Sequence, residues 1–145
     1  MKKASNLIKI AIPSLLALLG FSCFINGGYA EYGVPSATYK AKGIVVSEED
    51  NTPIEGIHAR LFMENSYRNY TLDSTLTDSY GSFSLIGHEF PGQMLYVELL
   101  HLDGELTGTF TKKILEADFT NATFTGGSGN WYEGQATIDL GTITF

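Results

Sequence analysis

The sequence has one cysteine, few basic residues and no apolar run long enough to stay in a membrane as a helix. A single cysteine cannot form an internal disulfide, so apolar burial must stabilise the folded state. The longest apolar run, Ile10–Phe21, is shorter than the roughly 17–25 residues that a spanning helix requires. No segment shows an apolar period typical of helices, which excludes a helical fold from our expectations.

Basic residues are scarce, since nine Lys and Arg stand against sixteen Asp and Glu in 145 residues. Lys2, Lys3 and Lys9 lie in a segment that we expect to be removed, which leaves six against sixteen and a net charge of −10. The only basic pair in the chain that remains is Lys112-Lys113, whereas nucleic acid binding depends on clustered Lys and Arg. We therefore expect no nucleic acid partner.

Residues 1–22 have the layout of a secretory signal peptide: two lysines, an apolar run, and small residues before Cys23. The preceding residues, Leu19-Gly20-Phe21-Ser22, resemble the lipobox of bacterial lipoproteins, whose cysteine becomes the lipidated N-terminus. Gly20 and Phe21 depart from that motif. Ordinary cleavage further on, for example after Ala30, is the alternative, and it would discard Cys23.

A lone cysteine at the end of an apolar run favours lipidation of Cys23 over ordinary cleavage. Each buried methylene of an acyl chain contributes ~0.8 kcal/mol, so several chains, palmitate among them, would hold the protein permanently. Residues 23–36 are rich in glycine without periodicity and predict a flexible tether. Phe24 rather than Asp follows the cysteine, which by resemblance to diderm lipoproteins favours the outer membrane. The periplasmic face and the cell surface both remain open.

Residues 37–145 show a period of two, typical of strands with one buried face. Gly141 separates two parities in the last strand, where a β-bulge would restore the face. Seven strands with turns about every 8–12 residues predict an all-β, two-sheet sandwich. The clearest predicted buried faces are Tyr39, Ala41, Gly43 and Val45; Ile57, Ala59, Leu61 and Met63; Leu95, Val97 and Leu99; and Leu115, Ala117 and Phe119.

The segments Lys42–Val46, Pro53–Ile57 and Thr77–Leu85 resemble the carboxypeptidase regulatory-like domain. The resemblance implies a seven-stranded Greek-key sandwich like that of transthyretin. It carries no catalytic residues, because in those proteins the module accompanies the enzyme.

Further segments extend a resemblance over nearly the whole chain, to the radical SAM-associated lipoproteins of diderm gut-type bacteria. That resemblance implies a lipoprotein and modification by a neighbouring radical SAM/SPASM enzyme, without an established activity. His101-Leu102 departs from it, standing where an acidic-aliphatic pair is expected. The segments that carry it are Glu31–Pro35, Ala37–Lys40, Phe90-Pro91, Asp103-Gly104, Asp118–Thr120 and Gly127–Gly134.

Catalytic and metal-binding patterns are weak. His58, His88 and His101 lack the close spacing of zinc ligands, and no G-x-S-x-G motif supports a hydrolase. The acidic segments Glu48–Asp50 and Asp73–Asp78 lack a calcium-loop pattern and predict solvated turns. We expect no catalytic residues, no metal and no cofactor.

The most distinctive candidate is Trp131-Tyr132 in a glycine-rich loop. An exposed aromatic pair could stack on a sugar or dock an envelope protein. Alternatively, Trp131 plugs one end of the sandwich, which is favoured because single large aromatics usually cap cores. The sequence thus predicts a non-enzymatic, lipid-anchored envelope module, with a carbohydrate-binding module as the second hypothesis and a hydrolase as the third.

Overall fold

The computed structural model describes residues 33–145 apart from 66–67 and 103–109. The compact unit is Gly33–Phe145. The expected signal peptide (1–22), Cys23, the tether up to residue 32 and the Asp103-Gly104 turn lie outside the described residues. Residues 33–36, expected as the end of the tether, belong to the compact unit. In the described part of the chain, no helix is long and apolar enough to cross a membrane.

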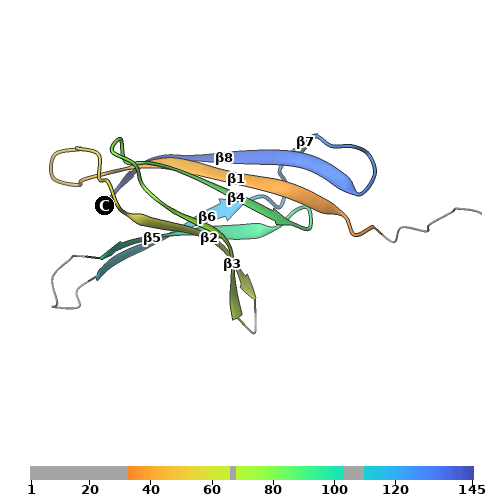
Figure 1. The fold of residues 1–145 in the computed structure, drawn as a ribbon, viewed down its shortest axis with the longest axis horizontal. Helices are drawn as coiled ribbons and strands as arrows, with labels where there is room; N and C mark the ends of the chain where they lie inside the picture. The colour runs from red at the N-terminus through yellow and green to blue at the C-terminus, as the bar shows by residue number, and fades with distance from the viewer. Residues whose placement is uncertain (1–32, 66–67, 103–109) are drawn as a thin grey trace, which may run out of the picture. The chain divides into compact units, whose positions relative to one another are not determined.

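The described residues form two four-stranded sheets that pack face to face as two layers (Figure 1). The first sheet has the order β4-β1-β8-β7 and the second the order β3-β2-β5-β6. The predicted all-β, two-sheet architecture is confirmed. The strands are β1 (Ser36–Val46), β2 (His58–Asn65), β3 (Arg68–Leu76), β4 (Ser82–Glu89), β5 (Met94–Leu102), β6 (Phe110–Asp118), β7 (Thr125–Gly126) and β8 (Tyr132–Thr144).

Two elements differ from the sequence-based expectation. The structure has an eighth strand, β7, whose two residues are too short to carry a period. β3 begins at Arg68, within the polar segment 64–70, where no alternating pattern predicts a strand. Asn69 and Tyr70 are both exposed, so this end of the edge strand has no alternation of buried and exposed residues to reveal it.

β1 is one of the two inner strands of the first sheet, antiparallel to β4 and parallel to β8. All pairings of the second sheet are antiparallel. The parallel pairing sets Ser36, at the start of β1, beside Tyr132, at the start of β8. The chain therefore enters the sandwich next to the loop that carries Trp131.

The predicted buried faces form the core between the sheets. Side chains with no exposed surface come from both layers, and Met63 and Leu115 pack against them as half-buried neighbours. The bulge expected at Gly141 is confirmed, because β1 advances by two residues from Lys42 to Ile44 while β8 advances by three. The fully buried apolar side chains include Tyr39, Ala41, Val45, Ile57, Ala59, Leu61, Leu85, Leu95, Val97, Leu99, Ala117 and Phe119.

The turn between β3 and β4 is held by its own hydrogen bonds and by a bond to β1. The carboxylate of Asp78 accepts the backbone N–H groups of Tyr80 and Ser82, each at 2.9 Å. Gly81 has a φ of 70°, and its carbonyl accepts the N–H of Val45 at 2.8 Å. A β-carbon at Gly81 would overlap the carbonyl oxygen of Val45, so both the backbone conformation and the space require glycine.

We expect Gly81→Ala to lower the free energy of unfolding by about 3 kcal/mol or more, since it combines a left-handed alanine with a steric overlap. Gly56→Ala is the matched control, because Gly56 also has positive φ (82°) but open space around the added β-carbon. It should cost only about 1–2 kcal/mol. Urea unfolding of both variants checks this, and equal losses would contradict the overlap.

Candidate functional site

One end of the sandwich is organised around Tyr39, a fully buried side chain of β1. Its ring meets Phe119 and Phe124 edge-on, with centroids 4.8 and 5.5 Å away. Its hydroxyl donates to the carbonyl of Phe90 and accepts the N–H of Gln93 at 3.3 Å. Burial raises the pKa of Tyr39 above its usual value. The three rings fill this end of the core.

Trp131 lies at the same end but outside the core. Its side chain is 51% exposed and its φ is 67°. Its carbonyl accepts the N–H of Ser36 at 2.7 Å, and its indole ring covers Gly33 so closely that a β-carbon there would overlap it. The prediction that Trp131 plugs the end of the sandwich is therefore wrong, because Tyr39, Phe119 and Phe124 already occupy that space.

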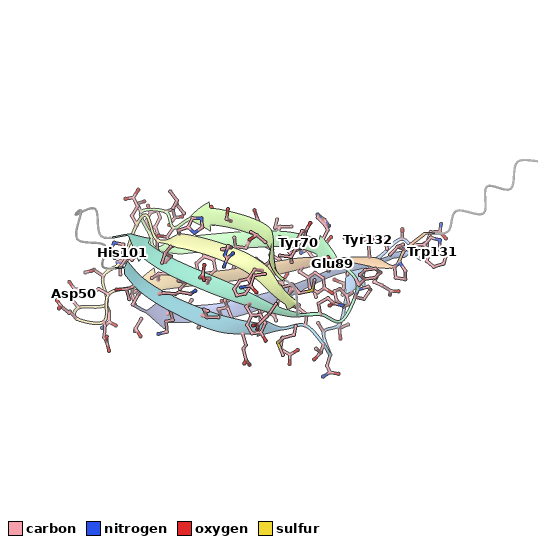
Figure 2. All side chains as sticks on the ribbon, turned by 90° about the horizontal axis from the view of Figure 1, so that it is seen from below. Asp50, Tyr70, Glu89, His101, Trp131 and Tyr132 are labelled. Atoms are coloured by element: carbon pink, nitrogen blue, oxygen red, sulfur yellow. The ribbon has the colours of Figure 1, made fainter. Side chains whose placement is uncertain are left out.

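Tyr132 is less exposed than its neighbour Trp131, and Figure 2 shows both residues at one end of the domain. It is half-buried, and its hydroxyl lies 2.8 Å from the hydroxyl of Thr38. Thr38 in turn lies 3.1 Å from Nδ1 of His88, the residue opposite it on β4. The two consecutive aromatics therefore do not form one stacking platform, and only Trp131 is mainly available to solvent.

Two shallow hollows share Pro35, and Trp131 lines one of them. The larger, of about 400 Å³, is lined by Pro35, Gly129, Asn130, Trp131 and Glu133. The smaller, of about 200 Å³, is lined by Val34, Pro35, Ser36, His88, Glu89 and Phe90. The first combines an aromatic ring with polar groups, and the second is mainly apolar.

The sequence analysis missed Val34 and Phe90 as surface features. Val34 is 59% exposed and Phe90 is 51% exposed. Each stands next to a proline at the edge of a strand, where an apolar residue is outside any alternating pattern. A search for apolar residues at such positions could have found them.

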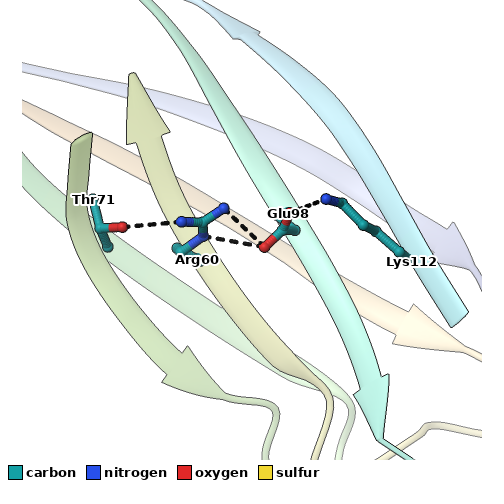
Figure 3. Close-up of polar contacts among 4 residues, drawn as sticks. All are labelled: Arg60, Thr71, Glu98 and Lys112. Atoms are coloured by element: carbon teal, nitrogen blue, oxygen red, sulfur yellow. Dashed lines mark hydrogen bonds and ion pairs between the residues drawn. The ribbon is translucent and has the colours of Figure 1, made fainter. Parts of the chain in front are cut away.

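A second candidate is Glu98, a buried carboxylate on the outer face of β5 (Figure 3). One of its oxygens lies 2.9 Å from Nη2 and 3.1 Å from Nε of Arg60, and the other lies 2.7 Å from Nζ of Lys112. Arg60 also donates to Thr71 at 3.2 Å and covers the ring of Phe62 at 4.7 Å. These contacts link β3, β2, β5 and β6.

The pKa of Glu98 reflects two opposed effects. Burial acts to raise it, but the hydrogen bond and charge of Lys112 and the charge of Arg60 together outweigh burial, so the pKa lies below its usual value. Both carboxylate oxygens are already paired with cations. We interpret this set as a cross-strand ion-pair ladder that stabilises the sheet. The only indication of this ladder in the sequence is that Arg60 and Glu98 alternate with the predicted buried residues of their strands and so should face outward.

The three histidines have different neighbours and do not form one group. His88 belongs to the Thr38 contact, and the ring of His101 lies edge-on to Phe145 with centroids 6.4 Å apart. His58 stands between Leu76 and Leu100 in the second sheet. In residues 33–145 as described, no three His, Asp or Glu side chains are grouped so that they could hold a metal ion.

Comparison with known proteins gave no matching family model and no match among curated proteins. Solved structures with partial likeness include a 9R-lipoxygenase from Cyanothece PCC8801, at 20% identity and a TM-score of 0.44 over 74% of this chain and 16% of that chain. A second is the dioxygenase domain of a dioxygenase carbohydrate-binding protein fusion from Streptomyces sp. SirexAA-E, at 17% identity and a TM-score of 0.41 over 82% and 86%. A third is (S)-allantoin synthase, at 12% identity and a TM-score of 0.39 over 74% and 41%. With TM-scores below 0.5, these likenesses support no functional argument.

We expect Glu98→Gln to lower the free energy of unfolding at pH 7 by about 1–3 kcal/mol, because two cations lose a charged partner. The folded-state pKa of Glu98 is depressed, so its contribution is present above the pKa of the unfolded state and is lost as pH falls through the folded value. The difference from wild type should persist at pH 5 and shrink below about pH 4. Urea unfolding at several pH values measures it.

Asp139→Asn is the matched control. Asp139 pairs with Lys42 at 3.0 Å, but both side chains are about half exposed, so solvent screens the interaction. This change should leave the unfolding midpoint at pH 7 nearly unaltered. A midpoint shift as large as that of Glu98→Gln would contradict the special position of Glu98.

Proposed function

We propose that the chain is a non-enzymatic, lipid-anchored protein of the bacterial envelope, held at the outer membrane through Cys23. The observation that carries the proposal is the position of this single cysteine, which is separated from the apolar run only by Ser22 and stands ten positions before the compact unit begins at Gly33. A short tether of this kind joins an acylated residue to a folded module without a spanning helix. The sandwich then acts as a binding or structural module.

The finer fold proposal is a seven-stranded, transthyretin-like Greek key supplemented by β7. Its support is the order of the strands: two antiparallel hairpins, β2-β3 and β5-β6, share the second sheet. β1 lies between β4 and the last strand, β8, in the first sheet. The proposal that the module is a substrate of a neighbouring radical SAM/SPASM enzyme, rather than an enzyme itself, rests on the resemblance of the sequence alone.

Carbohydrate binding is the second candidate function. It rests on the exposed ring of Trp131 beside the amide of Asn130 and the carboxylate of Glu133, which line one hollow. Aromatic faces next to polar acceptors suit the alternating apolar and hydroxyl surfaces of sugars. Because Tyr132 is half-buried and its hydroxyl is held by Thr38, this site would use one ring rather than two.

We expect the intact mass of the mature protein, expressed in a diderm bacterium, to correspond to a chain beginning at Cys23 and carrying acyl groups. Labelled palmitate should enter the wild type and not Cys23→Ser, which should leave the membrane fraction. Equal labelling of both forms would contradict the anchor. Coexpression with the neighbouring radical SAM enzyme should change the mass again. Identical masses would contradict the modification by that enzyme but not the anchor.

For the carbohydrate hypothesis, we expect saturable changes in the emission of Trp131, the sole tryptophan, when oligosaccharides are added. Glu133→Gln should weaken the response because it alters a group in the same hollow. Glu116→Gln, a change at an exposed carboxylate on β6, should leave it unaltered. A flat emission across a broad panel of oligosaccharides would contradict this function.

A further inference from the structure

Four residues form an exposed apolar surface where the chain enters the sandwich, and we name it the tether rim: Val34, Pro35, Phe90 and Trp131. Val34, Phe90 and Trp131 are each more than half exposed. Pro35 connects them, since it lines one hollow with Trp131 and another with Val34 and Phe90. The rim is therefore one continuous surface drawn from the chain entry, the end of β4 and the start of β8.

The tether rim is held in place by the core. The backbone of Trp131 is joined to Ser36, and its ring lies on Gly33. The carbonyl of Phe90 is held by the hydroxyl of the buried Tyr39. A surface fixed in this way loses little conformational entropy when it binds, which favours contact with a partner.

The chain itself indicates what the rim faces. Gly33 follows Cys23 by ten positions, and ten extended residues span at most about 35 Å. An acylated Cys23 therefore keeps this end of the domain close to the lipid. Asp50 and His101 lie at the opposite end (Figure 2). Tyr80, another exposed aromatic, belongs to the turn beside Val45, at the far end of β1.

The charge near the rim selects the kind of lipid surface. Glu89 and Glu133 line the two hollows, and no Lys or Arg does. An anionic bilayer would therefore repel this surface, whereas a zwitterionic one would not. Tryptophan, with its polar N–H on an apolar ring, is enriched at the level of phospholipid headgroups.

We propose that the tether rim rests on a zwitterionic phospholipid surface, with Trp131 at headgroup level and Val34 and Phe90 beside it. This inference rests on the proposed anchor at Cys23. The rim orients the domain on the membrane, while the acyl chains supply the attachment.

The test uses the full chain, purified from membranes and reconstituted into phosphatidylcholine vesicles with brominated acyl chains. Emission from Trp131 should shift to the blue when the domain contacts the lipid. Its intensity should be lower than with vesicles whose acyl chains lack bromine. The double variant Val34→Ser, Phe90→Ser should lose most of this quenching. The control Tyr80→Ser should retain it, and replacing part of the lipid by phosphatidylglycerol should reduce it.

Flotation of the vesicles separates failure of the anchor from failure of the rim. If the chain does not float with them, a chain that begins at Cys23 is produced without acyl groups, and coupling this sole cysteine to a maleimide lipid supplies the anchor for the same measurement. Once the chain is anchored, unquenched emission from Trp131, or quenching that the double variant retains, overturns the proposal. A change in the emission of Trp131 with oligosaccharides but not with lipid also overturns the proposal.

Discussion

A tyrosine hydroxyl enclosed between two β-sheets needs hydrogen-bond partners, because an unpaired buried hydroxyl costs about 1–3 kcal/mol. Tyr39 finds them in the segment between β4 and β5, where it donates to Phe90 and accepts from Gln93. Its ring also closes the core against Phe119 and Phe124. The position of Phe90, and with it the shape of the tether end, therefore depends on this one side chain.

The sequence was informative wherever a strand has one buried face. Alternation identified the core positions of β1, β2 and β5, and the change of parity around Gly141 located the bulge in β8. These features are local, because a period of two follows directly from the geometry of one strand. β7 was missed because it is too short to show that period. The start of β3 was missed because its residues are exposed and so do not alternate with buried ones.

The candidate site could be predicted only in part, because long-range pairing creates it. Trp131 and Tyr132 were singled out as a pair, but they differ in exposure and in their bonds: the backbone of Trp131 bonds to Ser36, and the hydroxyl of Tyr132 bonds to Thr38. Those bonds require the parallel register of β1 and β8, which join residues almost a hundred positions apart. Such a register cannot be inferred from composition. The cations around Glu98 were hidden for the same reason, since Arg60 and Lys112 come from two different neighbouring strands.

The direction of β1 also determines how an anchored domain would stand. β1 runs from the tether rim to Val46, and the exposed carboxylates of Glu48, Glu49 and Asp50 follow at the opposite end. An anchor at Cys23 would hold the rim at the lipid and direct this acidic turn away from it. Charged groups lose hydration near an apolar medium, so this orientation places the three adjacent carboxylates where that cost is smallest. No basic patch would be needed for it, because the proposed anchor would supply the attachment and the apolar rim would supply the contact.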